Sequence, residues 1–552
     1  MFFRQKRAGA YRYLQIVENH RERGKVRQRT LMTLGRLDVL QDSGQLDGLM
    51  RSGLRFCRKL AAIDAGEKGQ SEVVETIRIG PDLVFGRLWE RLGMKAELQA
   101  VLKNRRYEFD VERAIYLTVL HRLFVSGSDR SAEKWRRDYR IPGTEALDLH
   151  HLYRAMAFLG EALPKAEQGG KTPFAPRCTK DVLEERLFAR RRDLFTDLQM
   201  VFFDTTSIYF EGEGGELGEY GNSKDHRPDL KQMVVGVVLD SEGRPLCCEM
   251  WPGNITDVTT LLPVVKRLQK RFGIGEVCIV SDRGMISQKT IEELEKPKTN
   301  WKFILGARMR NQKEVRDEVL SRAGAYQTVH PARLNSKDLS PLKVKDVRQN
   351  GNRYVVCLNE AQRKKDAFDR EAIVDHLRTQ LKRGEKTLVG NKGYRKYLKG
   401  QGEDRFAVDE EKVAEEARYD GKWVLRTNLD LPAREIALKY KQLWMVEQIF
   451  RTLKSILETR PVFHKCTETI RGHVFCSFLA LCLRKKLDEQ LTTNGMDLEW
   501  QDIVCDLNEL QEVKTVFNGK SFILRSQLKG CAHSVLQAAG VAAPPIVREA
   551  LQ

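Results

Sequence analysis

The chain has 552 residues, of which 41% are hydrophobic, and at about 150 residues per domain it has room for roughly three or four domains. Its 95 Lys and Arg outnumber its 76 Asp and Glu, giving a net charge of +19, and no apolar run approaches the ~18 residues that a membrane span needs. These values exclude a small disulfide-stapled scaffold and a transmembrane protein, and they favour a polyanionic partner such as nucleic acid. The charges that directly follow Met1-Phe2-Phe3 argue against a secretory signal.

The first 75 residues are expected to form a basic β-hairpin and a linker. Residues 1–36 contain ten basic residues and two glutamates. Strand-like runs at 11–17 and 30–34, with a turn at Arg23-Gly24 between them, predict the hairpin. Such a hairpin could follow a phosphate backbone, or it could be a solvated charged face, and the pattern supports both interpretations equally.

Residues 76–195 are expected to form a helical, DNA-binding domain. Apolar residues recur at four-residue spacing between residues 111 and 123 and predict a helix. Turn residues follow at 126–129, and then a basic segment contains Lys134, Arg136 and Arg137. This pattern is typical of a helix-turn-helix DNA reader, but an ordinary surface helical hairpin has the same pattern. DNA binding by these three side chains is therefore a hypothesis.

The pattern of the chain changes at about residue 196. Three strand-like runs lie at residues 200–203, 232–239 and 246–251. They are followed by a helix at 258–268, an apolar strand at 277–280, a short helix at 287–295 and another strand at 301–305. Three antiparallel strands followed by a helical crossover into a parallel strand give the chain order of a ribonuclease H-like domain.

Residues 311–420 are highly charged and are expected to be an insertion into this core. The core itself is expected to comprise residues 196–310 and 421–490. Its second part is predicted to contain a strand at 422–426, one long helix from about Pro432 to Leu457, and an apolar helix from Gly472 to Leu487. Residues 491–552 are expected to be a C-terminal helical region.

Three carboxylates in this core are candidates for chemistry. Asp204 directly follows the first predicted strand and Asp282 the fourth, and these strands are neighbours in the predicted topology. Glu447 shares one face of the long helix with mostly apolar residues, namely Ile436, Tyr440, Leu443, Phe450, Lys454 and Leu457. Each acid alone has an ordinary explanation, as a turn residue or as the partner of Lys454, and only the three acids together indicate a catalytic site.

Hard divalent cations prefer carboxylate oxygens, and two such ions can act on both sides of a phosphodiester displacement. We therefore predict that Asp204, Asp282 and Glu447 are catalytic residues and metal ligands. The predicted cofactor is Mg²⁺, as two ions, with Mn²⁺ as a substitute.

A series of motifs resembles bacterial insertion-sequence transposases of the DDE type, in the IS-four-like group. The motifs lie at residues 203–207, 221–232, 252–257, 281–285, 440–454, 460–464 and 471–473. The resemblance implies an α/β fold with a ribonuclease H-like (retroviral-integrase-like) catalytic core and mixed sheet, interrupted by a β-rich insertion domain. It also implies Mg²⁺-dependent DNA cleavage at transposon ends and strand transfer into target DNA.

The group's signature Tyr-x2-Arg-x3-Glu-x6-Lys is present in part. Tyr440, Glu447 and Lys454 match it, but Leu443 stands where arginine is expected. The resemblance implies that Tyr440 and Lys454 bind DNA, and we add Arg451, as a substitute for the missing arginine, and Arg283 as DNA-binding candidates.

The implied partners are the terminal inverted repeats and target DNA, bound by a homodimer. The implied location is the bacterial cytoplasm, in association with the nucleoid. Two alternatives stay open, another ribonuclease H-fold nuclease and a domesticated, non-catalytic DNA-binding protein. The role of His226, Arg227 and Lys231 also stays open between binding DNA and ordering a loop.

Overall fold

The structure is a computed structural model. It describes residues 1–22, 25–54, 56–57, 72–168, 176–191, 200–273, 277–296, 301–330, 341–383, 395–400, 406–517 and 520–550. These residues form two compact units, one of residues 1–84, 138–140 and 497–552 and the other of residues 85–137 and 141–496. Within the described ranges, no helix is both long and apolar enough to cross a membrane.

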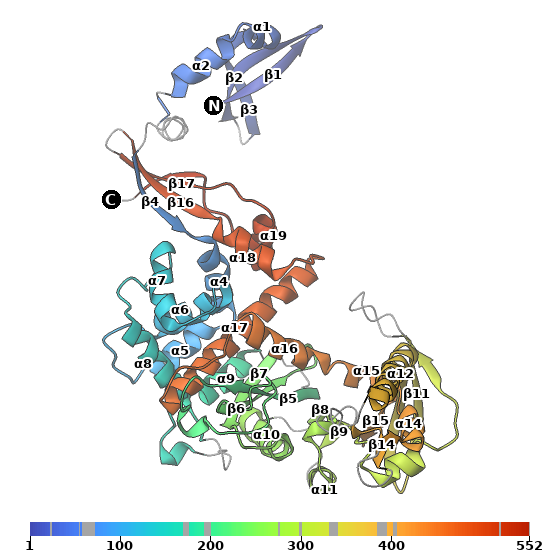
Figure 1. The fold of residues 1–552 in the computed structure, drawn as a ribbon. Helices are drawn as coiled ribbons and strands as arrows, with labels where there is room; N and C mark the ends of the chain where they lie inside the picture. Colours follow the sequence, from blue (N-terminus) through green and yellow to red (C-terminus); the bar gives the residue numbers. More distant parts are fainter. Residues whose placement is uncertain are drawn as a thin grey trace. The chain divides into compact units, whose positions relative to one another are not determined.

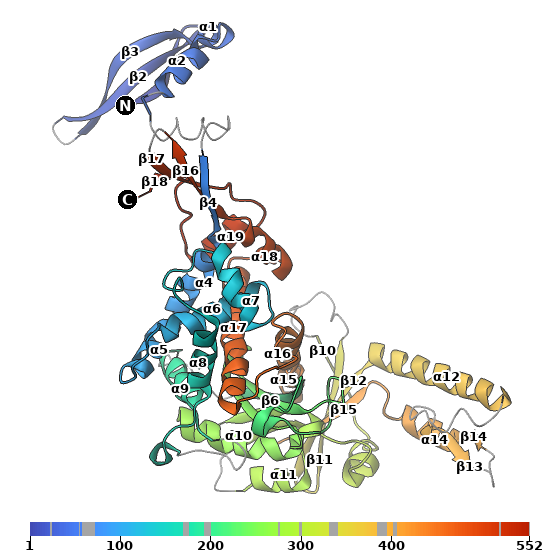
Figure 2. The same ribbon diagram turned by 60° about the vertical axis from the view of Figure 1, so that its left-hand side comes forward.

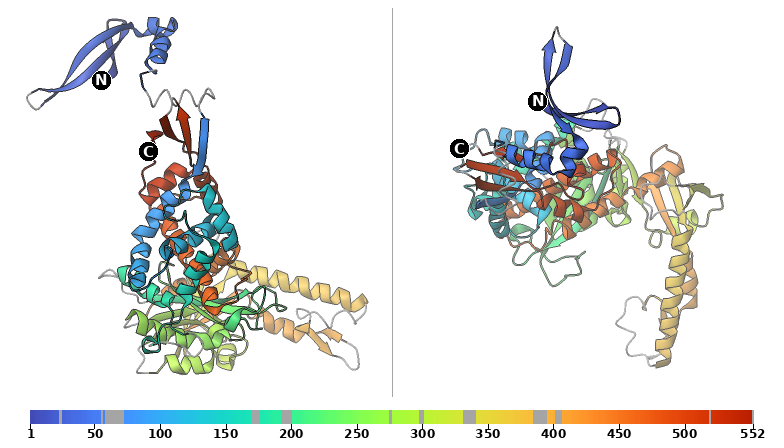
Figure 3. Two further views of the ribbon diagram at one scale, coloured as in Figure 1. Left: turned by 90° about the vertical axis from the view of Figure 1, so that its left-hand side faces the viewer. Right: turned by 90° about the horizontal axis from the view of Figure 1, so that it is seen from above.

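The first unit begins with a three-stranded antiparallel sheet. Its strands are β1 (Phe2–Ala8), β2 (Tyr11–Glu22) and β3 (Lys25–Arg36), in that order, followed by helices α1 (Leu37–Asp42) and α2 (Gln45–Leu54). Strands β2 and β3 pair as predicted, with Val17 opposite Thr30, and they form the twisted blue ribbon of Figure 3. The turn expected at Arg23-Gly24 lies outside the described residues.

The C-terminal residues correct one prediction, because the region expected to be helical is partly a sheet. Helices α18 (Trp500–Asn508) and α19 (Ala532–Ala539) are present, but β16 (Gln511–Phe517), β17 (Lys520–Arg525) and β18 (Val547–Glu549) form a sheet with β4 (Glu72–Arg78), in the order β18-β17-β16-β4. The run Val513 to Val516 is rich in β-branched residues, which favour strands. It pairs on one side with β17, which follows it in the chain, and on the other with β4, which is remote in sequence.

The second unit contains a layer of helices. It begins within α4 (Gly80–Arg91), at Phe85, and continues with α5 (Met94–Leu102), α6 (Val111–Phe124), α7 (Asp129–Trp135), α8 (Leu149–Gly160) and α9 (Thr179–Arg191). The 27-residue helix α17 (Thr467–Thr493) packs against α6 and α8 (Figure 1). A Cβ atom on Gly472 would lie 1.9 Å from the Met156 carbonyl oxygen, so α17 and α8 meet backbone to backbone there.

A nine-stranded mixed sheet forms the rest of the frame. Its strands are β5 (Met200–Tyr209), β6 (Gln232–Leu239), β7 (Pro245–Pro252), β8 (Cys278–Ser281), β9 (Lys302–Gly306), β10 (Gln327–Val329), β11 (Leu342–Gln349), β12 (Asn352–Asn359) and β15 (Lys422–Thr427). Their order is β10-β11-β12-β15-β9-β8-β5-β6-β7. As predicted, β5, β6 and β7 are antiparallel, and β8 is parallel to β5.

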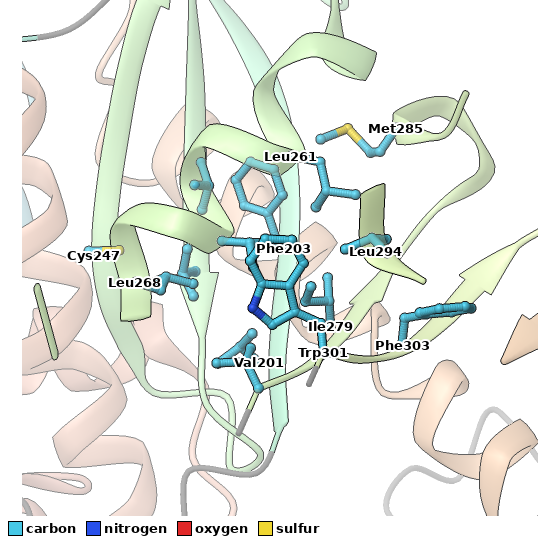
Figure 4. Packing of buried hydrophobic residues seen from close by; sticks show 14 of the residues in the cluster. Val201, Phe203, Cys247, Leu261, Leu268, Ile279, Met285, Leu294, Trp301 and Phe303 are labelled. Atoms are coloured by element: carbon cyan, nitrogen blue, oxygen red, sulfur yellow. The ribbon is translucent and has the colours of Figure 1, made fainter. Parts of the chain in front are cut away.

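One face of this sheet is covered by α10 (Asp257–Phe272) and α11 (Gln288–Leu294). Val201 and Phe203 of β5 point into this core and pack with Leu261, Leu268 and Ile279 (Figure 4). Because side chains alternate along a strand, Asp204 points to the opposite face. Helix α16 (Trp444–Ser455) contacts β5 and β6, and α15 (Ala433–Lys441) contacts β8 and β9.

The predicted insertion is continuous with the core sheet. Strand β15 pairs with β9 on one side and with β12 on the other, so β10, β11 and β12 extend the sheet beyond residue 310. Helix α12 (Glu360–Arg383) lies beside β14 (Phe406–Val408), which pairs with β13 (Leu398–Gly400) and precedes α14 (Glu410–Ala417) (Figure 2). The sheet is therefore continuous by hydrogen bonding across the boundary that was predicted at residue 310.

The single helix predicted from Pro432 to Leu457 is wrong, since the structure has two, α15 and α16. Between them the amide of Leu443 donates to the Tyr440 carbonyl at 3.0 Å, and that of Met445 to the Gln442 carbonyl at 3.0 Å. These bonds reach back three residues instead of four, which overwinds the backbone. The residues predicted to share one face of a single helix are therefore divided between two helices. Among them, Glu447 is exposed while Leu443 and Phe450 are buried.

Candidate active site

Two of the three predicted acids lie side by side in the sheet. Asp204 lies inside β5 and not after it, which corrects the prediction, because β6 continues to pair with β5 as far as Tyr209. Strand β8 ends at Ser281, so Asp282 follows it directly, as predicted. Since Phe202 is level with Val280 in the parallel register, Asp204 is level with Asp282.

The environment of Asp204 disfavours its charge. Burial raises the pKa of Asp204 to about 6, against the opposing effect of Lys224, and the charges of Asp282 and Asp257 raise it further. The Thr205 amide donates to Asp204 Oδ1 at 2.7 Å. Among the residues described, neither Asp204 nor Asp282 has a cationic partner within ion-pair distance. Lys224 therefore acts on Asp204 without a direct ion pair, and its effect does not overcome that of burial.

A further acid at this edge, Asp257, was not predicted as a site residue. It begins α10, and its Oδ1 accepts a hydrogen bond from Thr205 Oγ1 at 2.7 Å. Its Oδ2 forms an ion pair with Lys224 Nζ at 3.0 Å. The signal was present in the sequence, because Asp257 ends the motif at 252–257, but no periodicity relates it to the other acids.

Tyr440 is directed at the acid pair. Its hydroxyl donates to Asp282 Oδ1 at 3.0 Å, and burial, followed by the charge of Asp282, raises the pKa of Tyr440. A Cβ atom at Gly306 would lie 2.7 Å from this hydroxyl, so glycine leaves room for it. DNA binding by Tyr440 stays a prediction, while the structure shows a contact with Asp282.

Glu447, the third predicted acid, is placed differently. It is exposed in the first turn of α16, a helix that contacts β5 and β6. The carboxylate oxygens of Asp204, Asp282 and Glu447 do not all lie within 4.8 Å of one another. Asp204 and Asp282 thus interact at the sheet, while Glu447 lies on a helix that contacts β5, the strand of Asp204, and β6.

The predicted DNA-binding cations differ in their surroundings. Four are exposed, namely Lys134, Arg137, Arg283 and Arg451. Arg136 donates to the Glu145 carbonyl at 2.9 Å. Lys454 Nζ donates to Asp225 Oδ1 at 2.6 Å, and its side chain is 12% exposed.

The side chains of Arg227 and Lys231 have partners near their own loop. Arg227 forms an ion pair with Asp229 at 2.9 Å, and Lys231 pairs with Glu213. His226 adopts a positive φ of 57°. These contacts favour the loop-ordering interpretation for Arg227 and Lys231.

The two histidines of the motifs at 460–464 and 471–473 form a separate polar cluster. Nε2 of His464 lies 3.3 Å from Asp129 Oδ2 and 3.2 Å from His473 Nδ1, and these three residues could hold a metal ion. Both ring nitrogens of His473 are already engaged, since Nδ1 lies 2.8 Å from Arg122 Nη2 and Nε2 lies 3.1 Å from the Thr459 carbonyl. A guanidinium so close opposes a cation, so we interpret the cluster as a structural network.

The family model of the IS1634 family transposase N-terminal domain matches residues 3–66, and that of the transposase DDE domain matches residues 196–483. No curated protein matches the chain.

Among solved structures, a piggyBac transposase synaptic complex with hairpin DNA aligns with a TM-score of 0.36 and 11% identity, over 78% of this chain and 80% of that one. A Mos1 transposase paired-end complex with left transposon end aligns with a TM-score of 0.15 and 14% identity, over 36% and 61%. Both scores are low, so the assignment depends on the family models. Because the DDE model covers more than half of its length, the chain belongs to the insertion-sequence DDE transposases, enzymes of DNA transposition that cleave DNA and transesterify it.

Proposed function

We propose that this transposase cleaves DNA at insertion-sequence ends and transfers the strand to target DNA by a two-metal mechanism in a ribonuclease H-like core. The observation that carries the proposal is the pair Asp204 and Asp282, level on neighbouring parallel strands and without an ion-pair partner among the described residues. The strand order β7-β6-β5-β8-β9 supports a ribonuclease H-like core, since β7, β6 and β5 are antiparallel and β5, β8 and β9 are parallel.

The residues at this edge fit a hard divalent cation. Carboxylate oxygens are the ligands that Mg²⁺ prefers, and Mn²⁺ accepts the same donors. Burial raises the pKa of Asp204 because its charge is poorly solvated, and a nearby cation would relieve that cost. Asp204 and Asp282 would hold the ions from the sheet.

The chain's own groups have distinct roles in this mechanism. Asp282 is oriented by the Tyr440 hydroxyl, and Asp204 by the Thr205 amide. Glu447 completes the ligand set from α16, on whose surface it is exposed. Two Mg²⁺ ions, when bound, would activate the attacking water or 3′-hydroxyl and stabilise the leaving oxygen.

We further propose that the DNA partners are terminal inverted repeats and target DNA, held by a homodimer associated with the nucleoid. Phosphate contacts would come from the exposed cations Arg283, Arg451, Lys134 and Arg137, with Tyr440, Lys454 and Arg136 as further candidates. Such binding is largely electrostatic and should weaken steeply with salt.

The test compares the wild type with Asp282→Asn in Mg²⁺-dependent nicking and strand transfer on DNA that carries the element's ends. We expect Asp282→Asn to lose about 10³-fold or more in rate, since a lost metal ligand removes several kcal/mol of transition-state stabilisation. End binding should stay within about 2-fold.

The matched control is Asp369→Asn, the same change at an exposed position of α12. Equal cutting by the wild type and Asp282→Asn would show that the acid assignment is wrong. A wild type that binds the ends but never cuts them would favour the non-catalytic alternative.

A further inference from the structure

Two adjacent residues, Lys224 and Asp225, contact the two separate halves of the proposed site. They belong to the loop between β5 and β6. Lys224 Nζ donates to the Thr205 carbonyl at 2.8 Å and forms the ion pair with Asp257. Thr205 directly follows Asp204, so Lys224 ties the loop to the strand that carries the first acid.

Asp225 is tied to the other half, the helix that carries Glu447. Its Oδ1 accepts from Lys454 Nζ at 2.6 Å and also pairs with Arg460, and its side chain is only 3% exposed. Lys454 lies two helical turns after Glu447 on α16. A buried carboxylate with two cations is costly to separate from them, so this contact fixes the helix to the loop.

The loop backbone is itself held in place. The Lys224 amide donates to Ser207 Oγ of β5 at 2.7 Å. Ser223 Oγ accepts from the amides of Asp225 at 3.3 Å and Arg227 at 3.1 Å. With the backbone anchored to β5, the two side chains cannot shift independently of the strand.

We propose that Lys224 and Asp225 are positioning residues that set the spacing between Asp204 on β5 and Glu447 on α16. This inference depends on the proposed role of Glu447 as the third metal ligand. It assigns to Lys454 a structural contact, with buried Asp225, in addition to any contact with DNA. Neither Lys224 nor Asp225 needs to touch the reacting atoms.

The test measures Mn²⁺ affinity of the full-length protein by calorimetry, without DNA, beside end cleavage. Asp225→Asn should lower Mn²⁺ affinity about 10-fold, as is usual when a residue that orients a metal ligand is lost. In a Glu447→Gln background the same change should cost less than about 2-fold, because the ligand that it positions is already gone. Additive losses would overturn the inference.

Two further variants keep the test decisive. Glu216→Gln neutralises another acid of the same loop at an exposed position, and it should leave Mn²⁺ affinity unchanged. Asp225→Glu keeps the charge but moves it by one methylene, so it should fold if Asp225→Asn does not, and should give an intermediate affinity.

The remaining outcomes separate this inference from the proposed function. If Asp225→Asn weakens end binding but not Mn²⁺ binding, Asp225 acts through Lys454 on DNA and the inference is wrong. If Asp282→Asn is inactive while Asp225→Asn matches the wild type, only the positioning role fails. If Asp282→Asn itself cuts and binds Mn²⁺ normally, the proposed function fails.

Discussion

Helices α9 and α10 and strand β7 meet in a cluster of buried charges in which every acid faces a cation. Arg271 bonds Glu184 at 2.7 Å and Glu249 at 3.2 Å, and Arg267 bonds Asp181 at 2.7 Å. Its almost fully buried side chains are three acids and three cations, namely Asp181, Glu184, Glu249, Lys180, Arg267 and Arg271, and the less buried Glu185 also pairs with Arg271 at 2.8 Å. Although burial acts to raise the pKa of Asp181, the neighbouring cations lower it below its usual range.

The edge that carries Asp204 has a different balance. Asp204, Asp257 and Asp282 interact there, and Lys224 is the cation that opposes them at Asp204. Burial accordingly raises the pKa of Asp204 to about 6. In the cluster burial also raises the pKa of Glu184, but there each acid has a cation in direct contact, which Asp204 does not have among the described residues. A balanced cluster stabilises the packing of its own elements, whereas an unbalanced one has an electrostatic cost that an external cation can offset. The comparison therefore separates a structural charge cluster from a candidate metal site within the same unit.

The largest effect is expected from a substitution that removes a cation from the balanced cluster. Arg271→Met should destabilise the protein by about 3–5 kcal/mol, because it removes one of the cations that the buried carboxylates share and leaves the cluster with excess negative charge. Chemical denaturation measures this loss, and Mg²⁺ should not restore it. The control is Arg348→Met, at an exposed position. A loss no larger than that of the control would show that the cluster is not what stabilises this packing.

The second effect is a gain in stability, expected when a carboxylate is neutralised at the edge that carries Asp204. The folded-state pKa of Asp204, about 6, lies above its ordinary 3.8, so ionisation between these values costs stability as pH rises. Asp204→Asn should therefore stabilise the metal-free protein by about 2–3 kcal/mol at pH 8 and by little at pH 4.

Denaturation at the two pH values checks this, with exposed Glu447→Gln as the control. Equal effects of Asp204→Asn at pH 4 and pH 8 would contradict the electrostatic explanation.

A third, smaller effect is expected when Mg²⁺ is added to the protein. Mg²⁺ at about ten times its dissociation constant should stabilise the wild type by about 1.4 kcal/mol, because it binds the folded state alone. Thermal unfolding should show this rise in the wild type and in Arg348→Met, and no rise in Asp282→Asn. A rise of the same size in Asp282→Asn would place the metal elsewhere.

The smallest effect concerns the orientation of one ligand. Tyr440→Phe removes the hydrogen bond to Asp282 Oδ1 and should slow end cleavage about 5-fold, equivalent to about 1 kcal/mol. Single-turnover cleavage measures it, and raised Mg²⁺ should recover part of the rate. Tyr220→Phe, at a side chain that is 59% exposed, is the matched control. An unchanged rate in Tyr440→Phe would leave DNA contact as the remaining role for Tyr440.

Local patterns were sufficient for much of the catalytic core. The strands at 200–203, 232–239 and 277–280 and the helix at 258–268 appear in the structure as β5, β6, β8 and α10, because alternation and helical periodicity are properties of neighbouring residues. Asp282 was located correctly for the same reason, since it follows directly on a short apolar strand.

Other features depended on contacts that no local pattern contains. Strand β16 pairs with β17, its neighbour in sequence, and also with β4, more than 400 residues earlier, and the β5 strand continues past Asp204 because β6 pairs with it. The break between α15 and α16 separates Glu447 from Ile436 and Tyr440, with which a single continuous helix would have given it a shared face.

The sequence by itself determined the order of the core elements, the basic charge and the candidates Asp204, Asp282 and Glu447, because these follow from composition and short-range spacing. Only the tertiary structure decided that Asp257 and Lys224 join Asp204, that Tyr440 binds Asp282, and that Asp225 holds the helix of Glu447. Each of these contacts joins residues that are remote in the chain. Their geometry is set by the register of the sheet and the packing of helices on it, which spacing along the sequence does not encode.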